Sequence, residues 1–111
     1  MKQPHLNMKS IELTSENFDE TLANATLPVL VDFHASWCGP CKMLSPVIDQ
    51  IAEAKAGEAI VAKVDIDAAR DIAQRYKINS VPTLIVFQNG EPVVGASGMQ
   101  SKAAIESMID Q

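Results

Sequence analysis

Hydrophobic residues along the chain follow two alternating spacings, which predict strands and helices in turn. Residues 27–35, "LPVLVDFHA", form a nearly continuous apolar run, typical of a strand that is buried on both faces. Residues 59–66, "AIVAKVDI", form a second strand, and residues 8–14 a shorter one. In contrast, the apolar residues at 44, 47, 48 and 51 have the spacing of a helix that faces a core. That helix is expected to start near residue 38 and to end near Gly57.

The other segments complete this alternation. Helices are predicted over 15–25, over 68–77 with Asp67 as its cap, and over 101–111. Residues 81–97 read as two strands around Asn89-Gly90, a pair that favours the positive φ angles of a tight hairpin turn. Pro92 in the second of these strands has no N–H to donate, so that strand is expected at the edge of the sheet.

The resulting order of elements is β-α-β-α-β-α-β-β-α, which predicts the α/β class. Helices between strands predict parallel, right-handed crossovers, and the final hairpin adds an antiparallel pair. The expected architecture has three layers, α/β/α, with a mixed central sheet of about five strands and about four helices. A chain of 111 residues suggests a single domain over 1–111, with residues 1–9 as a loosely ordered N-terminal extension.

Composition and charge argue against some classes of function for this chain. Hydrophobic residues make up 47% of the chain, enough for a core, and the net charge is −5. An acidic chain is a poor candidate for binding nucleic acid or an anionic membrane. No apolar run has the length of a signal peptide or of a bilayer span. The expectation is therefore a cytoplasmic, monomeric protein.

The two cysteines, Cys38 and Cys41, are separated only by Gly39-Pro40, and three uses of such a pair are open. A structural zinc site needs about four ligands, whereas the chain offers one cysteine pair and two distant histidines, His5 and His34. A purely structural disulfide would close a very short loop and so stabilise the fold little. The third use is redox exchange.

The position of the pair favours redox exchange. It falls where a buried strand ends and a helix begins, and the start of a helix favours negative charge and hence a thiolate. Cys38 is then expected to be the exposed attacking residue. Cys41, one turn deeper, would resolve the mixed disulfide that Cys38 forms. Pro40 is well tolerated there, because its missing N–H would have no helical partner.

Two stretches, "VDFHASWCGPCK" and "SVPTLIVFQNGE", resemble the two hallmark segments of the thioredoxin family, and the similarity runs from about residue 11 to 109. The resemblance implies the thioredoxin fold and a thiol–disulfide oxidoreductase that reduces protein disulfides. Gly39-Pro40 between the cysteines is typical of the reducing members. The alternatives are a scaffold subunit that binds partners without turnover, or a disulfide oxidase or isomerase.

The resemblance also implies roles for other residues. Asp32 matches the carboxylate that moves the proton of the second cysteine, and Lys63 matches the lysine beside it. The Val81–Pro82 bond matches a cis bond that faces the cysteines. The residues expected to form an apolar docking surface for clients are Trp37, Gly39, Pro40, Val81, Pro82, Gly98 and Met99. Met99 stands where the family usually has a smaller residue, and its flexible thioether suggests broader partner choice.

His34 departs from the family pattern, which has an aromatic residue at this position. One interpretation is a strand histidine that only fills volume. The sharper hypothesis is that His34 titrates near neutral pH beside Asp32 and the cysteines, and shifts their potential toward oxidising. The resemblance further implies re-reduction by an NADPH-dependent thioredoxin reductase, with no cofactor or metal besides the cysteine pair.

Overall fold

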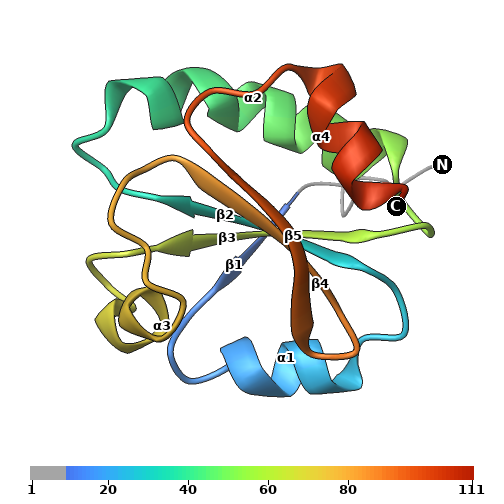
Figure 1. Cartoon of the computed structure of the whole chain (residues 1–111), viewed down its shortest axis with the longest axis horizontal. Coiled ribbons are helices and arrows are strands. Elements are labelled where there is room, and N and C mark those ends of the chain that lie inside the picture. Colours follow the sequence, from blue (N-terminus) through green and yellow to red (C-terminus); the bar gives the residue numbers. More distant parts are fainter. Residues whose placement is uncertain (1–9) are drawn as a thin grey trace, which may run out of the picture.

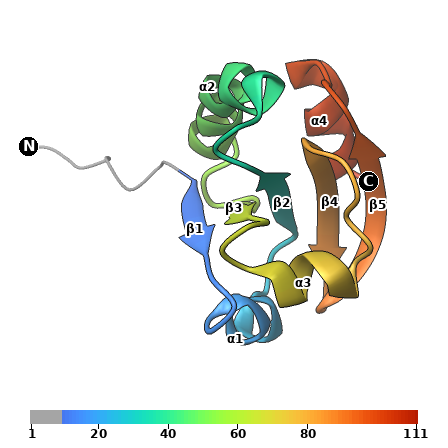
Figure 2. The same cartoon turned by 90° about the vertical axis from the view of Figure 1, so that its left-hand side faces the viewer.

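The computed structural model of the chain describes residues 10–111. The predicted extension over residues 1–9, which includes His5, lies outside the described residues. A central sheet is covered by α2 and α4 on one face and by α1 and α3 on the other (Figures 1 and 2), as the three-layer prediction requires. The elements are β1 (Ile11–Leu13), α1 (Phe18–Asn24), β2 (Val29–His34), α2 (Gly39–Ala54), β3 (Ile60–Asp65), α3 (Arg70–Arg75), β4 (Thr83–Gln88), β5 (Glu91–Ser97) and α4 (Lys102–Ile109).

The strands are arranged in the order β1-β3-β2-β4-β5, so β2 lies at the centre. It pairs with β3 in parallel and with β4 in antiparallel orientation. The predicted mixed sheet is therefore confirmed. This arrangement surrounds β2 with other strands, and the cysteines follow it directly in the sequence.

The direction of β4 corrects one expectation. A parallel crossover was expected through α3, but β4 runs antiparallel to β2. A helix of 6 residues is about 9 Å long, whereas a strand of 6 residues spans about 20 Å. Because α3 is too short to return the chain along the length of β3, β4 starts where β3 ends and runs back. In contrast, α2 has 16 residues and extends about 24 Å, enough for a full parallel return.

The final hairpin has the predicted form. Asn89 and Gly90 have φ angles of 54° and 80°, the left-handed conformation that this pair favours. β5 lies at the edge of the sheet, as Pro92 predicts. The register between β4 and β5 shifts between Val86 and Phe87, opposite Pro92. The missing N–H of Pro92 therefore lies on an edge strand, next to the shift in register.

The core is divided by the sheet into two clusters. Leu30, Leu84 and Val86 point to the face under α2 and α4, where they meet Leu44, Ile48 and Ile105. Val31, Phe33 and Val64 point to the opposite face, where they meet Phe18, Leu22 and Ile72 from α1 and α3. Alternate residues of β2 therefore belong to different clusters, because successive side chains of a strand point to opposite faces of the sheet.

Candidate active site

The two cysteines lie at the junction between β2 and α2. They form a disulfide with a Cα–Cα distance of 5.3 Å. Cys38 is the N-cap of α2, and its Sγ accepts a hydrogen bond of 3.1 Å from the backbone N–H of Cys41. A sulfur in this position meets an N–H group that has no helical carbonyl partner. In the reduced protein the same N–H would favour a thiolate on Cys38.

The burial of the pair corrects the expectation that Cys38 is exposed. Cys38 and Cys41 are each only 4% exposed, packed against Ala35, Ile66 and Val81. The Sγ of Cys38 lies 3.7 Å from the carbonyl oxygen of Val81. The loop before β4, which carries Val81, therefore packs against the sulfur of Cys38.

The loops around the disulfide form the rim of the site. This rim contains the residues that the resemblance assigned to client docking. The Val81–Pro82 bond is cis, and the Pro82 carbonyl accepts a 2.8 Å hydrogen bond from the N–H of Gly98. Gly98 has a φ of 84°, which glycine adopts easily. Gly39 and Pro40 are exposed at the start of α2. The site thus brings together loops before β4, after β5 and before α2.

Two large apolar side chains on the rim are solvent-exposed: Trp37 by 67% and Met99 by 50%. The indole N–H of Trp37 donates a 2.9 Å hydrogen bond to Asp67. Asp67 was predicted to cap α3, but the N-cap is Ala69, whose side chain makes no capping hydrogen bond. The aspartate instead orients the tryptophan.

Met43 is an exposed apolar residue that the sequence analysis did not assign to the site. It lies on α2 two positions after Cys41 and is 73% exposed. The sequence did contain a signal for it, because position 43 falls outside the core-facing stripe at 44, 48 and 51. Its side chain therefore adds exposed apolar surface to the helix that begins at the cysteine pair.

Behind the disulfide lies a polar pocket of about 210 Å³. It lies between residues of β1, β2 and β3 and the first two turns of α2, and is partly open to solvent. It brings together three residues that the sequence analysis singled out, Asp32, His34 and Lys63, with Cys41. The remaining lining residues are Glu12, Ala35, Ser36, Lys42 and Ser45.

Asp32 is the buried acid of this pocket, with an exposed fraction of 1%. Burial raises the pKa of its carboxyl from 3.8 to about 6, although the positive charges of His34 and Lys63 oppose the increase. Among the described residues, Oδ1 of Asp32 has no hydrogen-bond partner. A carboxyl group with a pKa near neutrality can both accept and release a proton under cellular conditions.

Lys63 lies beside Asp32 in the register of β2 and β3, but its ammonium group is directed toward α2. Its Nζ donates a hydrogen bond to Ser45 and lies 3.6 Å from a carboxylate oxygen of Asp49. The side chain is only 15% exposed. Lys63 therefore links the sheet to α2, and its charge acts on Asp32 without a direct hydrogen bond in this arrangement.

His34 forms the outer part of the pocket. Its Nε2 lies 3.3 Å from Oε2 of Glu12, a residue of β1 that was not predicted to belong to the site. The two side chains are 23% and 55% exposed. The histidine is thus only partly buried, and it contacts a carboxylate of the neighbouring strand. Its predicted effect on the redox potential stays a prediction.

Two observations concern other kinds of site. Across residues 10–111, no group of three or more histidine, cysteine, aspartate or glutamate side chains is arranged to hold a metal ion. Over the same residues, no helix combines the length and the apolar character that crossing a membrane requires.

Comparison with known proteins gives consistent matches. The family model described as Thioredoxin matches residues 9–111. A thioredoxin from Mycobacterium tuberculosis is 43% identical over 96 residues, which cover 86% of this chain and 83% of the relative. The bifunctional thioredoxin reductase/thioredoxin of Mycobacterium leprae has the same identity over 96 residues, but these cover only 21% of that longer protein.

Among solved structures, a thioredoxin variant from Halobacterium salinarum superposes with a TM-score of 0.85 at 34% sequence identity. The match covers 97% of this chain and 94% of the other. The similarity therefore extends over the whole described fold, and is not confined to the cysteine motif.

Proposed function

The chain belongs to the thioredoxin family and is a thiol–disulfide oxidoreductase, and we propose that Cys38 reacts with the client first and Cys41 second. It reduces protein disulfides by dithiol exchange through this pair. The observation that supports the order is the position of the sulfurs, since Cys38 caps α2 and Cys41 lies within its first turn. The capping sulfur accepts an N–H at the positive end of the helix, so it is the better thiolate.

In the first step, the Cys38 thiolate attacks one sulfur of a client disulfide. A bond forms between Cys38 and that sulfur, and the client disulfide breaks. The other client sulfur leaves as a thiolate and takes a proton from solvent. The product is a mixed disulfide between Cys38 and the client.

In the second step, Asp32 accepts the thiol proton of Cys41, and the resulting thiolate attacks the Sγ of Cys38. The Cys38–Cys41 disulfide forms, and the second client sulfur leaves and is protonated. Two electrons have passed from the cysteine pair to the client. The shared pocket of Asp32 and Cys41, together with a carboxyl pKa of about 6, supports this role for Asp32. Lys63 favours the ionised carboxylate through its charge.

The client docks on the apolar rim around the pair. Trp37 and Met99 supply exposed apolar area, and Met43 extends it. The backbone at Val81, before the cis bond, is available for a short β-type contact with an extended client segment. Gly39 and Gly98 have no side chain and let the client backbone approach closely, and Pro40 and Pro82 add apolar surface beside them.

The oxidised pair then requires a reductant. We propose an NADPH-dependent thioredoxin reductase as the donor, with no cofactor in this chain besides the cysteine pair. The name of the Mycobacterium leprae relative, which combines a thioredoxin reductase with a thioredoxin, supports this pairing. We place the activity in the cytoplasm, where cellular reductants keep such thiols reduced.

The order of attack is tested by trapping. Cys41→Ser leaves the attacking thiolate but removes the resolving thiol, so it should accumulate a mixed disulfide with oxidised insulin through Cys38. Cys38→Ser is the matched control and should trap about tenfold less, because its remaining thiol lies inside the first turn. Intact mass measurement of the adducts gives both yields.

Equal trapping by the two variants, or stronger trapping by Cys38→Ser, would contradict the proposed order. Turnover of insulin in the presence of a dithiol distinguishes an enzyme from a scaffold, since a scaffold would keep its function with serine at both positions.

A further inference from the structure

A row of charged side chains crosses the sheet beside the cysteines. Glu12 on β1 is in register with Lys63 on β3, and Lys63 is in register with Asp32 on β2. His34 follows Asp32 by two positions and therefore lies on the same face of β2. All four residues line one pocket with Cys41.

The proton of Asp32 has no route through a directly bonded side chain. Within residues 10–111, its Oδ1 is buried and has no hydrogen-bond partner. The ammonium group of Lys63 is engaged by Ser45 and lies near Asp49, on the α2 side. A polar pocket of about 210 Å³ has room for several water molecules, which can satisfy such an oxygen.

The outer part of the same pocket is formed by a second pair of proton-carrying groups. His34 is 23% exposed and Glu12 55%, so the pair reaches from the pocket to solvent. When Nε2 of His34 donates to Glu12, its Nδ1 is free to accept a proton. An imidazole can take a proton on one ring nitrogen and release the other, and its ordinary titration range is near neutral pH.

We propose that His34 and Glu12 form a path that carries protons between Asp32 and solvent during the reaction of Cys41. The inference rests on the proposed role of Asp32 as the proton acceptor. His34 and Glu12 act through Asp32 and touch no reacting sulfur, so they are positioning residues rather than catalytic ones.

The steps conserve protons and electrons. The thiol of Cys41 gives its proton to Asp32, and the thiolate supplies the electron pair of the new S–S bond. The protonated carboxyl passes its proton through pocket water to Nδ1 of His34, and His34 releases the Nε2 proton to Glu12 and so to solvent. The client disulfide is the oxidant that receives the two electrons, and its leaving thiolate takes a proton from solvent.

The charges around His34 come from each neighbouring element. The charged residues that line the pocket or pair in register with His34 are Glu12 on β1, Asp32 on β2, Lys63 and Asp65 on β3, and Lys42 on α2.

The test resolves the two chemical steps. An aromatic disulfide that releases a coloured thiolate at each step is mixed with the reduced protein, and the first phase reports Cys38 while the second reports Cys41. His34→Ala should slow the second phase roughly tenfold, and Glu12→Gln roughly threefold, with the first phase unchanged. These effects are smaller than the loss of a general base, because Asp32 is retained.

Chemical rescue separates proton transfer from packing. Imidazole buffer should restore the second phase of His34→Ala to within about twofold of the unmodified protein, whereas a bulky buffer of the same pH should not. His34→Gln keeps a polar side chain but cannot relay a proton, so its second phase should stay slow. Glu91→Gln, on exposed β5, is the matched control for Glu12→Gln and should leave both phases unchanged.

Three outcomes would overturn the path. A second phase that is unchanged in all His34 and Glu12 variants, while Asp32→Asn slows it, refutes the path but keeps the role of Asp32. Slowing by His34→Ala that His34→Gln repairs and imidazole does not would assign His34 to packing. A second phase unaffected by Asp32→Asn would remove the role of Asp32, and the path with it.

Discussion

The two faces of β2 have opposite characters. One face, formed by Val29, Val31 and Phe33, is fully buried in an apolar cluster. The other begins in the same way with Leu30 but continues with Asp32 and His34, which line the polar pocket. In these six consecutive residues, the side chains on one face pack in the core, and those at the end of the other face line the pocket beside the cysteines. We call these the apolar face and the redox face of β2.

The apolar face is packed with aromatic rings. Phe87 meets Phe18 at a centroid distance of 5.8 Å and Tyr76 at 5.2 Å, both edge to face. Phe33 meets Tyr76 at 6.4 Å. Such contacts add to the gain from burial, since aromatic edges and faces carry opposite partial charges. This face has no buried carboxylate, and its interactions are those of an ordinary core.

The redox face keeps a buried carboxylate at its end. An unpaired buried polar group costs stability, and here the cost falls on one strand end beside the cysteines. The contrast indicates that β2 can keep a destabilising buried carboxylate because the opposite face of the same strand is well packed. Substitutions on the two faces should therefore have effects of opposite sign.

The largest effect is expected from Phe33→Ala on the apolar face. Removing a fully buried ring should lower the free energy of unfolding by about 3–5 kcal/mol, because it leaves a cavity that the surrounding rings cannot fill. Insulin reduction per folded molecule should change little, since the ring points away from the pocket. Denaturant unfolding gives the first value, and a loss below about 1 kcal/mol would show that the apolar face is loosely packed.

Asp32→Asn on the redox face should have the opposite effect and raise the free energy of unfolding near neutral pH. Burial raises the pKa of Asp32 from 3.8 to about 6, which corresponds to roughly 3 kcal/mol. Below the unfolded value both states hold the proton, and the carboxyl costs no ionisation energy. As the pH rises from about 3.8 to about 6, the unfolded chain ionises while the buried carboxyl still holds its proton, so stability falls through this interval and stays at the lower level above it.

The variant lacks this pH-dependent loss. Its stability relative to the unmodified protein should therefore increase by roughly 3 kcal/mol between about pH 3 and about pH 8. The measurement is denaturant unfolding of both oxidised proteins at each pH. A difference that does not change with pH would contradict a buried, ionisable Asp32. Reduction of insulin by the variant should be slower, because the proton acceptor is lost.

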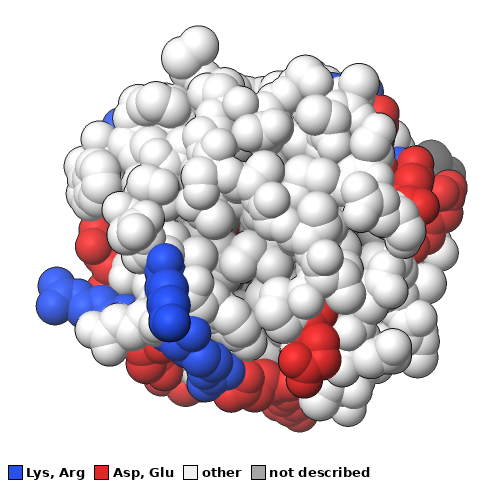
Figure 3. Space-filling view, viewed as in Figure 1, with Lys and Arg blue, Asp and Glu red and all other residues white. Residues whose placement is uncertain are grey.

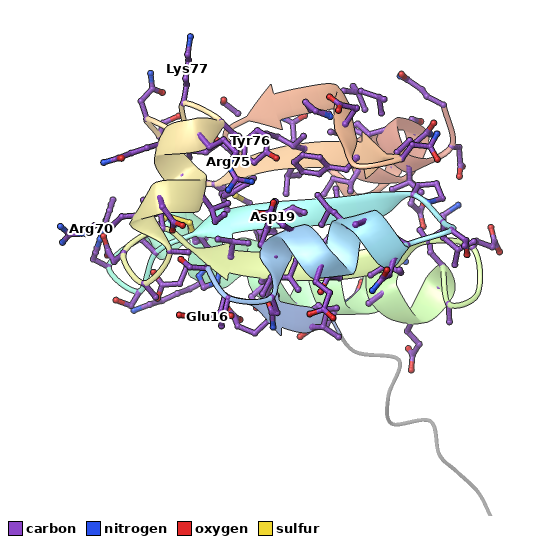
Figure 4. All side chains as sticks on the ribbon, turned by 90° about the horizontal axis from the view of Figure 1, so that it is seen from below. Glu16, Asp19, Arg70, Arg75, Tyr76 and Lys77 are labelled. Atoms are coloured by element: carbon purple, nitrogen blue, oxygen red, sulfur yellow. A yellow bond between two sulfur atoms is a disulfide. The ribbon has the colours of Figure 1, made fainter. Side chains whose placement is uncertain are left out.

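The smallest effect is expected at the surface beside the apolar face. Arg75 donates two hydrogen bonds to Asp19 and lowers the pKa of that carboxyl, and Figure 4 shows the two side chains facing each other. Basic side chains gather over α3 in Figure 3, in contact with solvent. Arg75→Gln should cost less than about 1 kcal/mol, because an exposed ion pair is screened. The loss should shrink further in high salt, and a salt-independent loss would indicate packing rather than charge.

Much of the fold was predictable, because hydrophobic spacing reports burial. The run over 27–35 predicted a strand buried on both faces, and the Asn89-Gly90 pair predicted the hairpin. The spacing does not report which strands pair, so the central place of β2 was not predicted. The direction of β4 depended on the length of α3, since a helix that is too short cannot complete a parallel return.

The site was predictable in its motif and less so in its surroundings. The cysteine pair and Asp32 lie in one short stretch, but Glu12 is 22 residues from His34 and Asp67 is 30 residues from Trp37. Contacts over such separations depend on the register between strands and on loop conformation. The burial of Cys38 was missed for the same reason, because Val81, which covers it, lies 43 residues away.

The central position of β2 has a consequence for hydrogen exchange. Within residues 10–111, β2, β3 and β4 are each paired on both edges, whereas β1 and β5 are each paired on one. Amides in a doubly bonded strand exchange only when most of the protein unfolds, but edge strands open locally at lower free energy. The slowest-exchanging amides should therefore be those of the three inner strands, among them β2, which ends shortly before the cysteines. The outer strands can open and close many times while the support of the redox pair stays intact.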